Sequence, residues 1–180
     1  MRTPFSAVAA SQNEIAAARA GDEIVAHANV VMNRAFTVDA PPAAVWPWLL
    51  QLGKRRAGWY LPASVERFLP AKRRAARAIQ PAWQQLRVGD VIPDYGRNET
   101  FTVAILTAPT TLVFRSRRGK LDLSWSITLL PEPAGDRTRL HLRLRLGTVR
   151  HRWLAETGGE LLDALTIVGL AAGLRERLRG

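Results

Sequence analysis

The 180-residue chain contains no cysteine, and this absence removes several kinds of chemistry at once. Disulfide bonds, thiol nucleophiles and thiolate metal sites are all excluded. Histidine is scarce as well, since only His27, His141 and His151 occur and no HExxH or histidine-rich pattern joins them. We therefore predict neither a metal site nor a cofactor. The longest apolar run, 165–174, is too short to cross a bilayer as a helix.

Lysine is the other scarce residue, because it occurs only at positions 54, 72 and 120 while the formal net charge is +11. A charge of this size attracts nucleic acid or anionic lipid headgroups. The arginines, however, are scattered over every segment, and no nucleic-acid-binding motif accompanies them. We favour a solvated, arginine-rich surface as the interpretation. Nucleic acid is not an expected partner, whereas peripheral contact with an anionic membrane and the oligomeric state both stay open.

Length and composition predict one globular domain, because 180 residues with 47% hydrophobic content can bury a sizeable core. No internal repeat or low-complexity linker divides the chain. We place an N-terminal extension at 1–29 and a single domain at 30–180. Residues 4–10 faintly resemble the end of a signal peptide, but their apolar stretch is very short and polar residues follow at once. We therefore expect a cytoplasmic protein.

The stretch 34–60 holds the clearest local pattern. Residues 34–39 alternate apolar and polar side chains, as a half-buried strand does, and the strand is predicted over about 30–39. A proline pair follows and suits the start of a helix, and apolar residues at helical spacing extend that helix over 42–52, before Gly53. The tryptophans of this stretch, together with Trp83, are interpreted as packing residues.

The rest of the chain reads as one more short helix, several strands and a long closing helix. The short helix is predicted at 62–68, and a strongly basic continuation at 72–77 is either a solvated helix face or a mobile lid. The long helix is predicted at 160–179. Alternation of apolar and polar residues predicts strands at about 101–105, 112–114, 121–129 and 139–146. Such alternation is typical of an antiparallel sheet with one packed and one solvated face, and His141 falls on the solvated face.

Two blocks of this sequence resemble a known superfamily. The first is TVDAPPAAVWPWLLQLGKRRAGWY at 37–60, and the second is PAWQQLRVGD at 81–90. Together they are similar to a bacterial branch of the SRPBCC superfamily, which contains the START-like, polyketide-cyclase-like and Bet v 1-like helix-grip proteins. The resemblance implies an α+β fold in which a curved antiparallel sheet wraps around a long C-terminal helix, with two short helices after the first strand. It says less about activity, because one fold hosts many functions.

Proteins of that superfamily are similar in using the space between sheet and helix for sterols, lipids, polyketides and other apolar molecules. The inward-facing residues are therefore candidate ligand contacts, although the same residues can simply fill a core. The candidates are Phe101, Val103, Ile105, Leu112, Phe114, Leu123, Trp125, Ile127, Leu142 and Leu144, with Leu165 and Gly169 from the last helix. Gly169 and Gly173 share one face of that helix, where they permit either close packing or room for a ligand.

The spacing of polar residues yields no trusted catalytic set. The weak candidates are Tyr60, Glu66, Asp90 and Asp94, and a buried carboxylate or tyrosine near a cavity mouth can act in acid–base catalysis of a cyclisation. The structural alternatives are an ion pair between Glu66 and a nearby arginine, and a backbone turn held by Asp90.

Three functions remain open from the sequence. The first is binding or transport of an apolar small molecule, such as a lipid or a polyketide. The second is an enzyme of the cyclase or dehydratase type, and the third is a basic interaction module for anionic lipid or nucleic acid.

Overall fold

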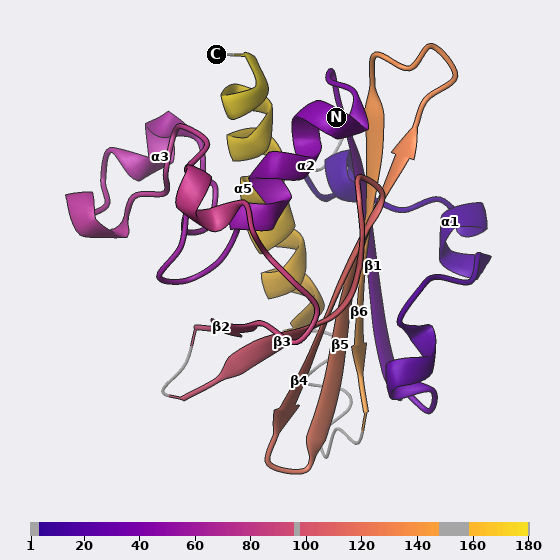
Figure 1. Cartoon of the computed structure of the whole chain (residues 1–180). Coiled ribbons are helices and arrows are strands. Elements are labelled where there is room, and N and C mark those ends of the chain that lie inside the picture. The colour runs from indigo at the N-terminus through magenta and orange to yellow at the C-terminus, as the bar shows by residue number, and fades with distance from the viewer. Residues whose placement is uncertain (1–3, 96–97, 148–158, 180) are drawn as a thin grey trace.

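The structure, a computed structural model, describes residues 4–95, 98–147 and 159–179. Within these residues six strands form one antiparallel sheet in the order β1-β6-β5-β4-β3-β2. The long helix α5 lies against one face of the sheet, and the short helices α2 and α3 lie beside it (Figure 1). The predicted α+β helix-grip architecture is confirmed.

Strands β2 to β6 form a meander in which each strand pairs with the next, and β1 pairs with β6 at the other edge of the sheet. The strands are β1 (Val30–Val38), β2 (Val91–Pro93), β3 (Thr100–Thr107), β4 (Thr111–Arg118), β5 (Leu121–Pro131) and β6 (Thr138–Leu146). The α-helices are α1 (Gln12–Ala16), α2 (Pro42–Gln51), α3 (Ala63–Glu66) and α5 (Glu160–Arg179). Short 3₁₀ helices lie at Pro4–Val8, Asp22–Val25, Ala71–Arg73 and Pro81–Trp83. In the described part of the chain, no helix is long and apolar enough to span a membrane.

The proline pair explains the turn from β1 into α2. Pro41 occupies the position before the helix in an extended conformation, and Pro42 begins the first turn, where a missing backbone donor costs nothing. Val45, Trp48 and Leu49 then bury one side of the helix in the core. The helix predicted at 42–52 is confirmed.

The hydrophobic core lies between the sheet and the C-terminal half of α5. Phe36 of β1, Leu129 of β5 and Leu140 of β6 share one cluster with Leu170 and Leu174 of α5, and none of the five is more than 1% exposed. Large apolar side chains buried this completely stabilise the fold by roughly 1.5–3 kcal/mol each. This packing fixes α5 on the sheet.

Strand β3 does not keep a regular alternation. The register shifts within it, so that Val103 pairs with Phe114 whereas Ile105 pairs with Val113. A bulge of this kind inserts an extra residue and turns the following side chains to the opposite face. The prediction that Ile105 faces α5 is therefore wrong, and Leu106 packs against the core in its place.

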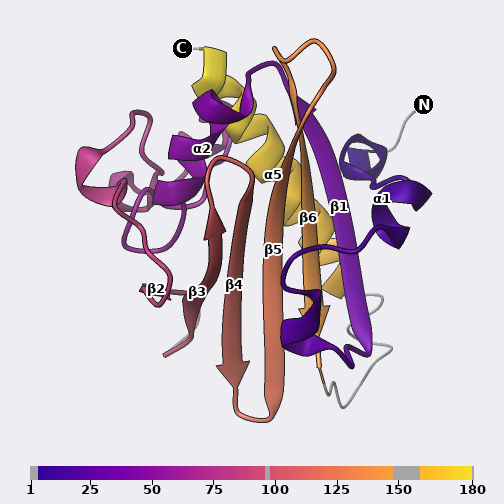
Figure 2. The same ribbon diagram turned by 45° about the vertical axis from the view of Figure 1, so that its right-hand side comes forward.

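The N-terminal segment covers the face of the sheet that looks away from α5. Figure 2 shows the chain between α1 and β1 crossing in front of the strands while α5 lies behind them, whereas Pro4–Val8 lies at the β1 edge and contacts α5. Arg143 of β6 donates from Nη1 to Asp22 at 2.7 Å and from Nη2 to the carbonyl oxygen of Ile15 at 2.8 Å. Arg139 holds Glu14 through two hydrogen bonds of 2.7 and 3.0 Å. The separation of 1–29 from a domain at 30–180 stays a prediction.

The prediction that His141 is solvated is wrong because of this cover. His141 lies on the outer face but is fully buried, and its Nδ1 accepts a hydrogen bond from Arg19 Nε at 3.3 Å. Burial, followed by the charges of Arg19 and Arg143, lowers the pKa of His141 to about 4. Its imidazole is therefore neutral at ordinary pH. His151 lies outside the described residues.

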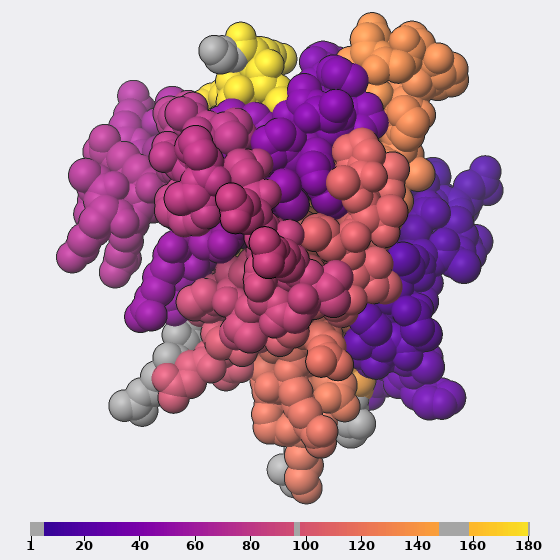
Figure 3. All heavy atoms as spheres, in the orientation of Figure 1, coloured from indigo at the N-terminus to yellow at the C-terminus, as the bar shows by residue number. Residues whose placement is uncertain are grey.

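The basic helix predicted at 72–77 is also wrong. Helix α3 ends at Glu66, Pro70 interrupts the chain, and only the 3₁₀ turn Ala71–Arg73 follows. Beyond that turn the backbone bonds to a distant segment instead of forming helical hydrogen bonds. The N–H of Ala76 donates to the carbonyl oxygen of Ala57 at 2.7 Å. We call residues 62–77 the basic lobe, and its atoms project on the left of the space-filling view (Figure 3).

Candidate functional site

An open cavity of about 1060 Å³ lies between the N-terminal half of α5, the inner face of the sheet and the basic lobe. Its apolar lining comes mostly from four strand residues and from α5. The strand residues are Phe101, Leu123, Trp125 and Leu144, and the helix contributes Leu162 and Ile167. Proteins bind small molecules in apolar hollows of roughly 300–1,000 Å³, so the volume is sufficient for a ligand of that class.

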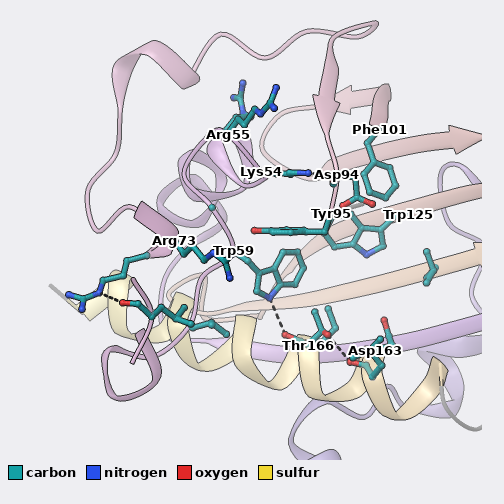
Figure 4. A pocket seen from close by; sticks show the side chains of 18 of the residues that line it. Lys54, Arg55, Trp59, Arg73, Asp94, Tyr95, Phe101, Trp125, Asp163 and Thr166 are labelled. Atoms are coloured by element: carbon teal, nitrogen blue, oxygen red, sulfur yellow. Dashed lines mark hydrogen bonds between the residues drawn. The ribbon is translucent and has the colours of Figure 1, made fainter. Parts of the chain in front are cut away.

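One wall of the cavity is aromatic and rigid. The ring centroid of Trp125 lies 5.9 Å from that of Trp59, 6.2 Å from that of Phe101 and 5.7 Å from that of Phe114. Trp59 is fixed in turn, because its Nε1 donates to the carbonyl oxygen of Thr166 at 3.3 Å. Figure 4 shows the rings of Trp59, Phe101 and Trp125 facing the interior of the cavity. They offer a ligand a flat, preformed apolar surface.

A short loop presents three consecutive basic residues at the mouth of the cavity. Gly53 and Gly58 exchange backbone hydrogen bonds of 3.2 and 2.9 Å, and these bonds close the loop between them. Both glycines have positive φ, which glycine adopts without strain. Arg55 at the tip also has φ of 60°, a left-handed conformation that costs an ordinary residue about 1–2 kcal/mol. Arg56 secures the loop by donating from Nη2 to two backbone carbonyl oxygens at 2.8 Å.

Basic side chains outnumber acidic ones by seven to two along the described lining of the cavity. The basic ones are Lys54, Arg55, Arg56, Lys72, Arg73, Arg74 and Arg118. The two acids already pair with arginines, Asp94 with Arg118 and Asp163 with Arg34. A concave site with low-dielectric walls strengthens such a field relative to an open surface. The cavity therefore favours negative charge at its mouth.

Asp163 is the acidic group on the α5 side of the cavity. Its Oδ2 lies 2.9 Å from Arg34 Nε. Burial raises the pKa of Asp163, and the charge of Arg34 opposes that effect only in part. Asp163 therefore gains a proton earlier on acidification than an exposed aspartate does.

The structure brings part of the predicted ligand-contact set to the cavity. Phe101, Leu123, Trp125 and Leu144 line it directly. Phe114 lies behind Trp125 and borders a small adjoining void of about 50 Å³. Whether these residues touch a ligand stays a prediction.

The other predicted contacts lie elsewhere in the fold. Four of them fill the core at no more than 2% exposure, and they are Val103, Leu112, Ile127 and Leu142. Leu165 is 52% exposed and lies outside the cavity lining. Gly169 and Gly173 face the chain at Leu61, where a Cβ at either position would approach within 2.7 Å of other atoms. Close packing is therefore what these two glycines provide.

Tyr60 is a structural residue in this arrangement. Its side chain is fully buried, its hydroxyl donates to the carbonyl oxygen of Trp48 at 2.7 Å, and its ring lies 4.6 Å from the Arg177 guanidinium. Burial raises the pKa of the phenol far above its ordinary value. Tyr60 does not line the cavity, so it has no access to a substrate there.

Glu66 forms an ion pair with arginine, as the structural alternative to catalysis predicted. Its Oε1 accepts from Arg177 Nη2 at 2.7 Å, and its Oε2 accepts from Arg77 Nη2 at 2.9 Å. Burial alone would raise the pKa of Glu66, but the hydrogen bonds from the two arginines outweigh burial and lower it. A carboxylate held in its charged form is a poor proton donor. Glu66 joins the basic lobe to α5.

The two aspartate candidates are engaged as well. Asp90 accepts the backbone N–H of Arg87 at 2.8 Å, so the predicted turn is confirmed. Asp94 lines the cavity, but its carboxylate is paired with Arg118. The four candidates therefore form no acid–base pair that faces the cavity. Within the described ranges, no group of three or more histidine or acidic residues is placed to hold a metal ion.

Sequence reasoning missed the basic side of the site. Lys54, Arg55 and Arg73 come from two separate segments, and only the tertiary structure brings those segments to one mouth. Trp59 was interpreted as packing, although it forms part of the cavity wall. The available signal was three consecutive basic residues between two glycines inside the block at 37–60.

Neither a family model nor a curated protein matches the sequence. Several solved structures are similar in fold. One is a protein from Arthrobacter aurescens, with 18% identity over 90% of this chain and 92% of that chain and a TM-score of 0.49. Others are CalU16 from Micromonospora echinospora (19%, 83% and 84%, TM-score 0.46) and Aha1 from Colwellia psychrerythraea (14%, 82% and 98%, TM-score 0.48). At such identities and TM-scores, nothing about function carries over to this chain.

Proposed function

We propose that this chain binds an apolar small molecule, such as a lipid or a polyketide, in the cavity between α5 and the sheet. The open, aromatic-walled space of about 1060 Å³ is the observation that carries the proposal. The helix-grip architecture and the two sequence blocks at 37–60 and 81–90 support assignment to the SRPBCC superfamily, whose members use this space for apolar ligands. The ion-paired state of Glu66 and the buried hydroxyl of Tyr60 favour binding over catalysis.

The expected affinity follows from ligand size. A ligand of about twenty non-hydrogen atoms that gains roughly 0.3 kcal/mol per atom binds with about 6 kcal/mol, or a Kd of tens of micromolar. The preformed aromatic wall reduces the cost of ordering on binding. Titration at micromolar protein concentration is therefore the suitable range.

Filling the cavity from α5 tests the proposal. Thr166 lines the cavity, so Thr166→Phe places a ring in the space that a ligand would occupy. Leu165 is its neighbour on the same helix and points outside the lining, so Leu165→Phe is the matched control. We expect the neutral fluorophore N-phenyl-1-naphthylamine to bind the parent chain and the Leu165→Phe variant, and to bind at least about fivefold more weakly to Thr166→Phe.

Circular dichroism and urea unfolding of both variants establish that they keep the fold. Equal binding of the fluorophore by folded Thr166→Phe and by the parent chain would place the apolar site elsewhere. Absence of binding to the parent chain would overturn the proposal.

A second function, peripheral contact with an anionic membrane, is favoured by one exposed aromatic residue. Phe68 of the basic lobe is 76% exposed, and the guanidinium of Arg67 lies 4.6 Å from its ring. Lys72 and Arg73 of the same lobe line the cavity. We propose that the lobe rests on an anionic bilayer, with Phe68 in the interface and the cavity mouth close to the lipid.

Vesicle sedimentation tests this second function. We expect binding to phosphatidylglycerol vesicles to exceed binding to phosphatidylcholine vesicles, and to weaken several-fold in Phe68→Ser. Val88→Ser is the control, because Val88 is another strongly exposed apolar residue (62%) outside the lobe. Equal loss in both variants, or equal binding to both lipids, would refute the proposal.

A further inference from the structure

We infer that the ligand is an amphipathic acid, which has an apolar body and one terminal anionic group, a carboxylate or a phosphate monoester. The anionic group binds at the mouth, between the loop Lys54–Arg56 and Arg73 of the basic lobe. This inference rests on the proposed function, because it names the chemistry of the ligand that the cavity takes.

The first support is the unbalanced charge at the mouth. Arg55, Lys72 and Arg73 line the cavity, and the ion pairs found among the described residues include none of the three. Like charges that line one cavity repel one another, so the free protein bears a cost that an anion removes on binding. The mouth is therefore complementary to a negative group that the described residues do not supply.

The second support is the contrast with other arginines of the same chain. Arg139 is paired with Glu14, Arg143 with Asp22 and Arg177 with Glu66, each at 2.7 Å. In each of these three pairs an acid of the chain lies against the guanidinium, and other arginines, such as Arg56, are held by backbone carbonyl groups. At the mouth of the cavity, Arg55 and Arg73 have no such acid among the described residues, so they do not have the same structural role.

The third support is the construction of the loop. Two glycines close it through mutual hydrogen bonds, Arg56 secures it from within, and Arg55 keeps a left-handed backbone conformation at its tip. Lys54 is held as well, because its Nζ donates to the carbonyl oxygen of Asp94 at 2.8 Å. A backbone conformation that costs energy persists where the surrounding structure fixes it, and such positions concentrate at binding sites.

The distribution of charge also orients the ligand. In Figure 4 the ring of Trp59 lies between Arg73 on one side and Thr166 and Asp163 on the other. The carboxylate of Asp163 repels an anion, whereas Arg73 attracts one. The acid group therefore lies at the loop and the lobe, and the apolar body extends along Trp59 and Trp125 toward α5.

Three probes of equal chain length separate the polar end from the apolar body. Decanoate carries a carboxylate, decyl phosphate carries a phosphate monoester, and decan-1-ol carries neither. Each is used to displace N-phenyl-1-naphthylamine at neutral pH from the parent chain, from Arg55→Gln/Arg73→Gln, and from Arg115→Gln. Arg115 is exposed on β4, outside the cavity lining, so Arg115→Gln controls for a general loss of positive charge.

We expect at least one acid to bind the parent chain more tightly than decan-1-ol, and the stronger of the two acids identifies the head group. In the double variant the affinity for that acid falls about tenfold, since exposed charge pairs each contribute modestly. The affinity for decan-1-ol changes by less than about twofold in every variant, and added salt reduces the preference for the acid.

The two proposals fail in different ways. If decan-1-ol and both acids bind equally, or if the double variant keeps the parent preference, the inference of an anionic ligand is refuted. The proposal that the cavity binds an apolar molecule then still stands. An equal loss in Arg115→Gln would also refute the inference of an anionic ligand, because the effect would then come from net charge alone. If neither the fluorophore nor any probe binds the parent chain, the proposed function itself fails.

Discussion

The outer face of the sheet and the mouth of the cavity use the same residue type in opposite ways. On the outer face, Arg139 and Arg143 bind acids and carbonyl groups of the N-terminal segment, and their guanidinium groups are partly or almost completely covered. At the mouth of the cavity, Arg55 of the loop after α2 and Arg73 of the basic lobe form no ion pair among the described residues. One set of arginines stabilises the fold, and we propose that the other set binds the anionic group of a ligand.

The difference follows from what each arginine costs and contributes. A buried guanidinium must be matched with acceptors, because an unmatched buried charge destabilises the fold strongly. An exposed guanidinium contributes little to stability and is free to serve binding. The net charge of +11 therefore includes two kinds of arginine, one buried and paired and one exposed. Substitutions distinguish them by their effect on stability.

The largest effect is expected for Arg143→Met. This change leaves Asp22, Asn33 and two backbone carbonyl groups without the donor that now satisfies them. We expect a loss of about 3 kcal/mol in the free energy of unfolding, measured by urea denaturation. Arg115→Met, on the exposed surface of β4, should change stability by less than about 0.5 kcal/mol. Similar stability of the two variants would refute the structural role of the outer-face arginines.

The next effect concerns the contact between α5 and the chain that leads into the basic lobe. At Gly173 an added Cβ would lie 2.6 Å from backbone atoms of Tyr60 and Leu61, whereas at Gly169 it would meet the flexible end of the Leu61 side chain at 2.7 Å. We expect Gly173→Ala to cost about 2 kcal/mol of stability and Gly169→Ala less than about 1 kcal/mol. Thermal unfolding of the two variants measures the difference, and the reverse order would contradict this packing.

Acidification tests the outer face through His141. Its pKa is about 4 in the folded chain and about 6.5 when unfolded, so the unfolded state takes up the proton first as the pH falls. Stability is complete above about pH 6.5 and declines toward about pH 4, with a slope of at most about 1.4 kcal/mol per pH unit from this residue. Urea unfolding between about pH 7 and about pH 5 should show a smaller decline in His141→Gln. An unchanged pH profile in that variant would contradict the burial of His141.

The smallest effect on stability is expected at the mouth of the cavity. Arg73→Met removes an exposed side chain that belongs to no ion pair in the described part of the chain, so stability should change by less than about 0.5 kcal/mol. Urea denaturation in the absence of ligand measures it beside Arg143→Met. A loss as large as that of Arg143→Met would mean that Arg73 stabilises the fold. It would remove the contrast between the outer face and the mouth of the cavity.

The architecture was predictable because its signals are local. The alternation around Trp125, the proline pair before α2 and the helical spacing of apolar residues within 42–52 each depend on neighbouring residues alone. These signals identify strands, helices and the inward face. The helix-grip arrangement of these elements was expected from the resemblance of the two blocks at 37–60 and 81–90.

The errors arose where a distant segment decides the outcome. A bulge in β3 turned Ile105 outward, the N-terminal segment buried His141, and acceptors on other elements replaced the helix expected at 72–77. The basic mouth of the cavity was missed for the same reason, because Arg55 and Arg73 come from distant segments that line one cavity only after folding. Alternation also cannot distinguish residues that line a space from residues that fill a core, as the positions of Leu123 and Ile127 show.

The most direct measurement is a crystal structure of the chain with decanoate or decyl phosphate, whichever binds more tightly. We predict density for the alkyl chain against Trp59 and Trp125, with the anionic group beside Arg55 and Arg73. Density for the ligand on another surface, or with its anionic group turned toward Asp163, would contradict the assignment of the cavity as a site for an amphipathic acid.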